Sequence, residues 1–220
     1  MISLVLEAAT YSGSVALLDG PRLLGQRSVT MRGREHEALM PAVAALLDEC
    51  GVSPARLGRV VCGAGPGSFT SLRIAGGIAK GIAMAAGVAL VPVSSLALLV
   101  ASQASLAPGR YLAAIDALRG EHYVELYDVA ADGEVRPLAP TRLVPSASVL
   151  ATAAAHGAWV VGPGQPERAV EPHARAAARL TRLIDATGAA DLAAWEPAYG
   201  RFAEAQVKWE AEHGRPLVTP

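Results

Sequence analysis

The residues best suited to chemistry stand in one glycine-rich stretch, residues 63–73, which reads Gly-Ala-Gly-Pro-Gly-Ser-Phe-Thr-Ser-Leu-Arg. Ser68, Thr70 and Ser71 are residue types that cap helices, and the unpaired amides at a helix N-terminus attract anions. The glycines allow backbone angles that other residues avoid. The stretch therefore predicts either a tight strand-to-helix turn or an anion-binding loop. It is not a Walker A loop, because no Gly-Lys-Ser/Thr follows, and it lacks GxGxxG with an acid on a second strand.

Metal and nucleophile chemistry have little support in the residue spacing. No two of the five histidines stand four residues apart, so the zinc pattern of paired histidines on a helix is missing. The histidines are His36, His122, His156, His173 and His213. Ser68 is not part of a GxSxG motif, which would mark a nucleophile. We therefore expect no catalytic residue and no metal site.

Two further loops have the positions, but not the residues, of a nucleotide hydrolase. A two-lobed hydrolase normally places an aspartate after its first strand and an Asp-Gly pair in its second lobe, where they hold magnesium and phosphates. Here Glu7 is followed by Ala8 and Ala9, and Asp116 is followed by Ala-Leu-Arg. No cofactor is expected, although weak nucleotide binding stays open.

Composition sets the class of protein. The chain has 220 residues, of which 52% are hydrophobic and 18% charged, so it can bury a large core. A net charge of −1 argues against nucleic-acid binding through overall charge. Two cysteines, Cys50 and Cys62, are too few for a disulfide framework, so we expect both to be buried, reduced thiols. Residues 81–109 carry no charge, but Gly87 and Pro92 divide the run, so no membrane span is expected. Met1 opens directly onto a strand pattern, which predicts no signal peptide.

The hydrophobic pattern predicts mixed sheets with helices packed on them, an α/β fold. Strands are expected at residues 2–6, 14–18, 23–29, 59–62, 88–91, 111–115, 122–127 and 158–161, and helices at 36–50, 72–86, 146–156 and 166–187. A strand-turn-strand-hairpin pattern occurs twice, at residues 2–29 and 111–144. We therefore predict two related lobes, residues 1–105 with the partner-binding helices and a smaller lobe at residues 106–220. Arg175, Arg179 and Arg182 are expected on one helix face, either solvated or facing RNA.

The helix expected over residues 72–86 has one apolar face that suits packing on a sheet. Its other face contains Arg73, Gly76, Gly77, Lys80 and Met84. The helix over residues 36–50 repeats Leu39, Val43 and Leu46 at helical spacing. Both helices could simply be core, or both could meet the same helices of a partner, because small residues let helices approach closely. In the glycine-rich stretch before the second of these helices, Gly67→Val is expected to cost about 1–3 kcal/mol of stability.

Several segments in order resemble the bacterial TsaB (YeaZ) family. The most specific is the signature loop Gly65, Pro66, Gly67, Ser68, Phe69 and Thr70, continuing to Ile74. Residues 4–10, 36–47, 115–123 and 196–201 resemble the family's opening strand, first helix, second-lobe hairpin and C-terminal motif, so the resemblance covers nearly the whole chain. Two departures weaken nucleotide binding: Glu7-Ala8-Ala9 replaces Asp-Thr-Ser, and Leu118 interrupts Asp-Ala-Arg.

The resemblance implies a two-lobed actin-like ATPase fold (ASKHA, RNase H-like) and a cytoplasmic location. It implies a non-catalytic scaffold that pairs with the catalytic subunit TsaD and acts with the ATPase TsaE. The complex modifies the adenine next to the anticodon of tRNAs that read ANN codons, forming threonylcarbamoyladenosine. The helix surface would serve both TsaD and a homodimer, and tRNA would be met only through the complex.

Other classes of function remain open at this point. One is a nucleotide hydrolase or glycoprotease-like peptidase of the same fold, and another is a homodimeric structural protein. TsaD has a metal-binding HxxxH motif, whereas Met40 stands four residues after His36 here. This difference favours the non-catalytic partner.

Overall fold

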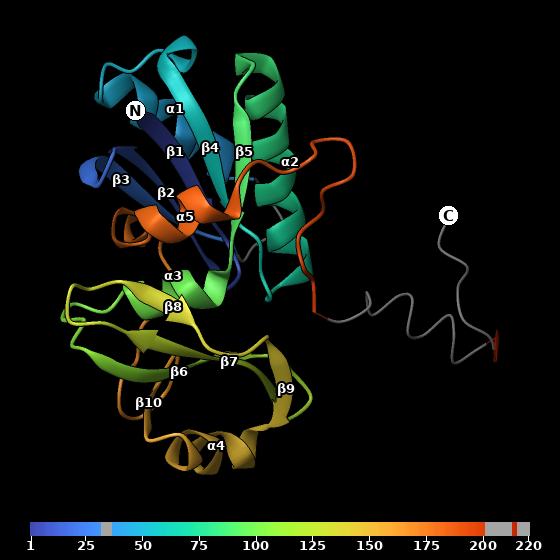
Figure 1. Ribbon diagram of the computed structural model, residues 1–220. Helices are drawn as coiled ribbons and strands as arrows, with labels where there is room; N and C mark the ends of the chain where they lie inside the picture. Colours follow the sequence, from blue (N-terminus) through green and yellow to red (C-terminus); the bar gives the residue numbers. More distant parts are fainter. Residues whose placement is uncertain (32–36, 201–212, 215–220) are drawn as a thin grey trace.

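The computed structural model describes residues 1–31, 37–200 and 213–214. Two lobes lie one above the other, each built on a five-stranded sheet (Figure 1). The first lobe contains β1 (Ile2–Glu7), β2 (Ser12–Asp19), β3 (Arg22–Thr30), α1 (Leu39–Glu49), η1 (Pro54–Arg56), β4 (Leu57–Gly63), α2 (Phe69–Ala86) and β5 (Ala89–Val93). After α3 (Ser95–Ala101) come β6 (Gly109–Asp116), β7 (Glu121–Val129), β8 (Val135–Pro137), β9 (Arg142–Pro145), η2 (Ser146–Ser148), α4 (Val149–Ala155) and β10 (Ala158–Val161). The last elements are η3 (Ala174–Arg179) and α5 (Thr181–Thr187).

The first sheet has the strand order β3-β2-β1-β4-β5. Tight turns join β1, β2 and β3, which are antiparallel, whereas helical crossovers make β4 and β5 parallel to β1 and to each other. The second sheet repeats the antiparallel opening in β6 and β7, with β10 parallel to β6. This confirms the two-lobed, actin-like architecture that the sequence implied.

The first sheet is covered on both faces, which explains why three consecutive residues of β1, Leu4, Val5 and Leu6, are apolar and buried. Leu4 and Leu6 of β1 face the cluster formed with α1 and α2. Val5 points to the opposite face, where α3 and η3 pack. A third cluster joins α4 to the outer face of the second sheet.

Helix α3 explains the central part of the uncharged run at residues 81–109. All seven of its residues are buried, in a cluster that includes Val61 of the first sheet and Tyr111 of the second. A helix between two sheets has no face on which a charge could reach water. Among the described residues, none of the helices is long and apolar enough to cross a membrane.

The chain after β10 departs from the expected second lobe. Segment η3 packs against β2, and α5 packs against β5. Beyond α5, residues 188–200 form an irregular segment with a turn at residues 192–194, here called the strap, which crosses α2 (orange in Figure 1). The amide of Ala190 donates to Leu90, and the amide of Ala198 donates to Ala64 at 2.7 Å. By these contacts η3, α5 and the strap pack largely on the first lobe. The domain boundary between residues 105 and 106 remains a prediction, and it concerns only the division between the two sheets.

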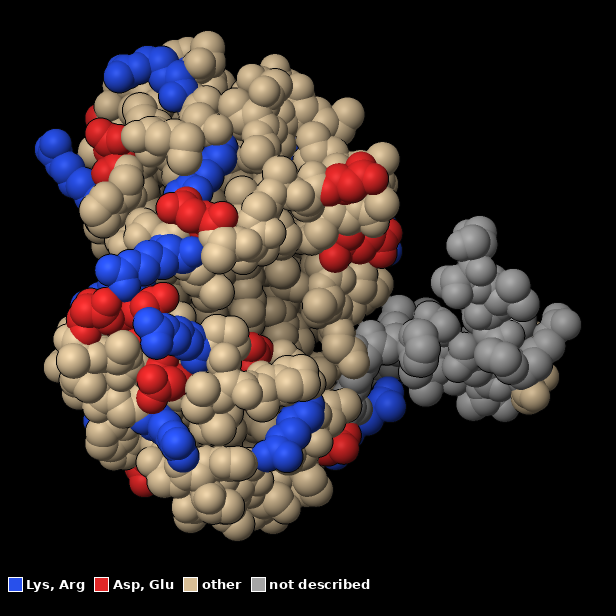
Figure 2. Space-filling model, in the orientation of Figure 1, with Lys and Arg blue, Asp and Glu red and all other residues tan. Residues whose placement is uncertain are grey.

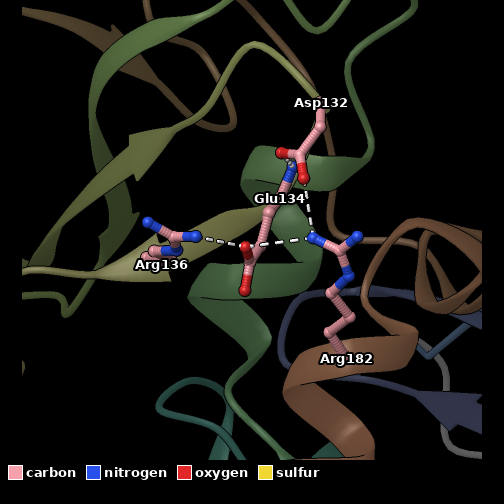
Figure 3. Close-up of polar contacts among 4 residues, drawn as sticks. All are labelled: Asp132, Glu134, Arg136 and Arg182. Atoms are coloured by element: carbon pink, nitrogen blue, oxygen red, sulfur yellow. Dashed lines mark hydrogen bonds and ion pairs between the residues drawn. The ribbon is translucent and has the colours of Figure 1, made fainter.

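The three arginines expected on one helix face are separated, because η3 is a 3₁₀ segment that ends at Arg179 and α5 begins anew at Thr181. Arg179 donates to the carbonyl oxygens of Ala101 and Gln103. Arg182 of α5 lies between Asp132 and Glu134 of the β7–β8 turn, at 2.7 and 3.2 Å (Figure 3). Arg182 therefore connects α5 to the second lobe, whereas Arg179 holds η3 against the end of α3. Of the three, only Arg175 is left exposed without such a role. On the face shown in Figure 2, basic and acidic side chains are interspersed rather than gathered into a basic patch.

Candidate functional site

The glycine-rich loop, residues 64–68 between β4 and α2, is held in place by backbone hydrogen bonds. The amide of Ala64 donates to Val93, and the amide of Ser68 donates to Ala9, both at 2.7 Å. Gly65 has a left-handed backbone, with φ +87°. Gly67 is required for a different reason: an added Cβ would lie 2.1 Å from the carbonyl oxygen of Ala9. The loop is therefore a tight strand-to-helix turn packed on the β1–β2 turn.

Glu7 ends β1 beneath this loop and is fully buried. Its carboxylate accepts hydrogen bonds from the Ala9 amide at 2.6 Å and from the Ser95 hydroxyl at 2.8 Å. Ser95 in turn accepts from the Gly65 amide. Burial raises the pKa of Glu7 to about 7, although these hydrogen bonds oppose the shift. Glu7 thus connects β1, the loop and α3, and its carboxylate is not exposed to a ligand.

The buried Glu7 gives the protein a specific pH dependence. Because the folded-state pKa lies above the unfolded value of 4.5, the folded state favours the protonated acid. The stabilisation is present below about pH 4.5 and is lost as pH rises through about 7. The Glu7→Gln side chain stays neutral at every pH and still forms hydrogen bonds. The stability of this variant relative to wild type should therefore rise by roughly 2–3 kcal/mol between about pH 4.5 and pH 7.

Urea unfolding of both proteins at a series of pH values measures this difference. Subtracting one curve from the other removes the contribution of His173, whose pKa burial lowers to about 4. A difference that does not change between pH 4.5 and 7.5 would contradict the assignment.

The remaining loop residues begin α2 and border a cleft between the lobes. Phe69 packs against Tyr199 of the strap, with ring centroids 4.5 Å apart. The hydroxyl groups of Ser68 and Ser71 lie 3.0 Å apart, so neither caps the helix by a side-chain hydrogen bond. Gly67, Ser68, Phe69 and Thr70 line the cleft. The signature loop therefore positions both the start of α2 and one wall of the cleft.

The structure corrects the expectation for α1. Leu39, Val43 and Leu46 are at most 1% exposed and lie in the core beneath the helix. They hold α1 on the sheet and present no surface to a partner. The residues that the first half of α1 exposes are different ones, and none of them is charged: Met40, Pro41 and Ala44.

The predicted face of α2 is divided by the strap. Gly76 lies under it, because an added Cβ would approach Pro197 to 3.0 Å. Lys80 donates to the carbonyl oxygen of Trp195 at 2.8 Å. These two residues are therefore used within the chain, and the part left exposed contains Arg73, Gly77 and Met84.

Gly77 and Gly81 stand out on this exposed part, because an added Cβ at either would meet nothing within 4 Å. A glycine inside a helix costs roughly 1 kcal/mol relative to alanine. Nothing among the described residues near these positions requires that cost. We call the exposed residues Arg73, Gly77, Gly81 and Met84 the α2 surface. Within it, the side chain of Met84 is 67% exposed. Sequence reasoning missed Gly81, although its position one turn after Gly77 indicates the same face.

Metal-binding chemistry receives no support from the part of the chain that the structure describes, where no group of three His, Cys, Asp or Glu residues could hold an ion. His36, one of the sequence candidates, lies outside the described residues, as does Arg201 of the C-terminal motif. Cys62 is buried, and burial beside Glu7 raises the pKa of its thiol, whereas Cys50 is only half-buried.

Known proteins resemble this chain in both sequence and structure. The model of the TsaD family, described as tRNA N6-adenosine threonylcarbamoyltransferase, matches residues 31–178. The tRNA threonylcarbamoyladenosine biosynthesis protein TsaB of Bacillus subtilis is 32% identical over 127 residues, which are 58% of this chain and 55% of the relative. Its counterpart from Escherichia coli is 37% identical over 123 residues, 54% of this chain and 52% of the relative. The chain thus spans about half the length of the curated relatives it matches.

The solved structure of YeaZ from Pseudomonas aeruginosa agrees over a longer range. It superposes with a TM-score of 0.74 at 28% identity and covers 90% of this chain and 99% of that one. The family model, the TsaB sequences and the YeaZ structure agree with one another. The chain therefore belongs to the TsaD family, within its TsaB (YeaZ) branch.

Proposed function

We propose that this protein is a non-catalytic partner subunit in the formation of threonylcarbamoyladenosine in tRNA. It would pair with TsaD, act with the ATPase TsaE, and serve tRNAs that read ANN codons, in the cytoplasm. The names of the relatives support the pathway: those from Bacillus subtilis and Escherichia coli are both called tRNA threonylcarbamoyladenosine biosynthesis proteins. The specific partners are our inference.

The observation that carries the proposal is the pair of open glycines on α2. Gly77 and Gly81 lower the stability of the helix relative to alanine, and no contact within the described part of the chain requires a glycine at either position. A helix from another subunit supplies one, since two helices approach most closely where side chains are small. The α2 surface has a charge only at Arg73, so its desolvation by a partner is inexpensive. TsaD and a second copy of this chain would compete for it, and tRNA would be met only through the complex.

The non-catalytic part of the proposal rests on Glu7 and Met40. The hydrolase alternative needs an acid free to bind magnesium at the end of β1, but the acid there is buried and accepts two hydrogen bonds. The peptidase alternative needs the paired histidines of TsaD, and Met40 stands at the second position. The proposal as a whole is tested by mixing the protein with a TsaD homologue, for which sedimentation should show a stable heterodimer.

A further inference from the structure

A cleft of about 1460 Å³ opens between the two lobes. One wall is formed by the β1–β2 turn and the first residues of α2, and the other by the β6–β7 turn and Leu143 of β9. The end of the strap, Tyr199 and Gly200, closes one side. The cleft is separate from the α2 surface, because none of the four residues that define that surface lines it.

Several large apolar side chains gather along the lining of the cleft. Three of the large hydrophobic side chains that the structure leaves exposed lie here: Tyr11 at 47%, Leu118 at 62% and Leu143 at 41%. The tilted ring pair of Phe69 and Tyr199 adds aromatic surface. Side chains from five separate segments thus place apolar surface around one hollow, which is typical of a binding site.

The β6–β7 turn presents one of these side chains at a conformational cost. Leu118 and Arg119 have φ of +62° and +57°, a left-handed backbone that residues with a Cβ rarely adopt, and Gly120 continues it at +76°. The turn is held by a hydrogen bond from the Leu118 amide to the Asp116 carboxylate at 2.8 Å. Strain of this kind concentrates at binding sites, where the surrounding structure maintains it. Here it maintains an exposed leucine at the cleft.

The charges around the cleft are mostly negative. Asp116, Glu121 and Glu171 line it, against the single cation Arg119. Glu171 accepts a hydrogen bond from Thr10 at 2.7 Å and remains exposed. A polyphosphate would meet three carboxylates, whereas lysine or arginine side chains would meet complementary charge and aromatic rings.

We propose that the interlobe cleft binds an extended segment of a partner protein in which basic and apolar residues alternate. The apolar side chains rest on Leu118, Tyr11 and Leu143, and the basic side chains face Asp116 and Glu171. An extended peptide suits this hollow better than a small ligand, because the apolar and acidic groups are distributed along its length on both lobes. The proposal does not depend on the pairing with TsaD, which uses a different face.

A fluorescent octapeptide of alternating arginine and leucine, titrated with the full-length protein at about 150 mM salt, tests the proposal by anisotropy. Wild type should bind saturably, and the same peptide with glutamate in place of arginine should not. Glu171→Gln, which can still accept from Thr10, should weaken binding at least tenfold. Asp48→Asn on α1 is the matched control and should leave binding unchanged.

Leu118→Asn isolates the apolar contact, because asparagine tolerates the left-handed backbone that the turn needs. It should keep the melting temperature of wild type while weakening the peptide at least tenfold. Equal binding by wild type, Leu118→Asn and Glu171→Gln would place the peptide elsewhere and overturn the proposal. Displacement of the peptide by micromolar ATP with magnesium would also overturn it, because the cleft would then be a nucleotide site.

Discussion

Gly77→Glu is expected to give a folded protein that no longer pairs with a TsaD homologue. The monomer accommodates the side chain, because an added Cβ at Gly77 meets nothing within 4 Å, and glutamate has a higher helix propensity than glycine by roughly 0.5–1 kcal/mol. In the complex the same side chain separates the helices and buries a charge. We expect pairing to weaken at least 100-fold, which is about 2.7 kcal/mol.

The control for this variant is Ala154→Glu, which places the same charge on the exposed side of α4 in the second lobe. It should pair like wild type. Circular dichroism and thermal melting establish that both variants are folded, and sedimentation with the TsaD homologue measures the pairing. If folded Gly77→Glu still forms the heterodimer at wild-type affinity, the interface does not include the α2 surface.

Gly67→Val is expected to destabilise the protein by about 3 kcal/mol, at the upper end of the range that the sequence indicated. The first atom of the new side chain would lie 2.1 Å from the carbonyl oxygen of Ala9. That oxygen cannot move easily, since it accepts from Ser68, and the Ala9 amide is bound to Glu7. The β1–β2 turn would have to shift away from the loop.

Gly77→Val is the matched comparison for Gly67→Val. It introduces the same side chain at a glycine with open space around it and should change the free energy of unfolding by about 0.5 kcal/mol or less. Urea titration of the isolated monomers measures both values. Equal stability of the two variants would show that the loop tolerates a side chain at Gly67 and that the crowding is relieved without cost.

The sequence predicted the strands of both sheets and the helices α1, α2 and α4 well because their signals are local. The single helix expected over residues 166–187 was wrong, since that range holds only the 3₁₀ segment η3 and the short α5. The apolar runs indicate the strands of both sheets. The helical spacing of apolar residues, with a glycine at the end of each helix, indicates α1 and α2 on the first sheet. The glycine loop was predicted as a turn, but α2 begins at Phe69, three residues before the expected start. The reason for Gly67 also differed: a close approach to Ala9, rather than its own backbone angle, excludes a side chain there.

What the sequence could not give were contacts between distant segments. Gly76 and Gly77 are adjacent glycines, so the sequence does not distinguish them. The path of the strap determines that Gly76 is covered and Gly77 is open. Leu39 has the spacing of a partner-binding face and the spacing of a core face, and three-dimensional packing decides for the core. Arg182 was assigned to a helix surface, but its partners lie 50 residues away along the chain.

Reconstitution of the tRNA modification from purified components tests the central claim most directly. Homologues of TsaD and TsaE, a tRNA that reads ANN codons and the substrates are combined with and without this protein. Threonylcarbamoyladenosine is then measured after nuclease digestion. We expect modification only when the protein is present, restored by wild type and Ala154→Glu but not by Gly77→Glu. Full modification in its absence would contradict the account.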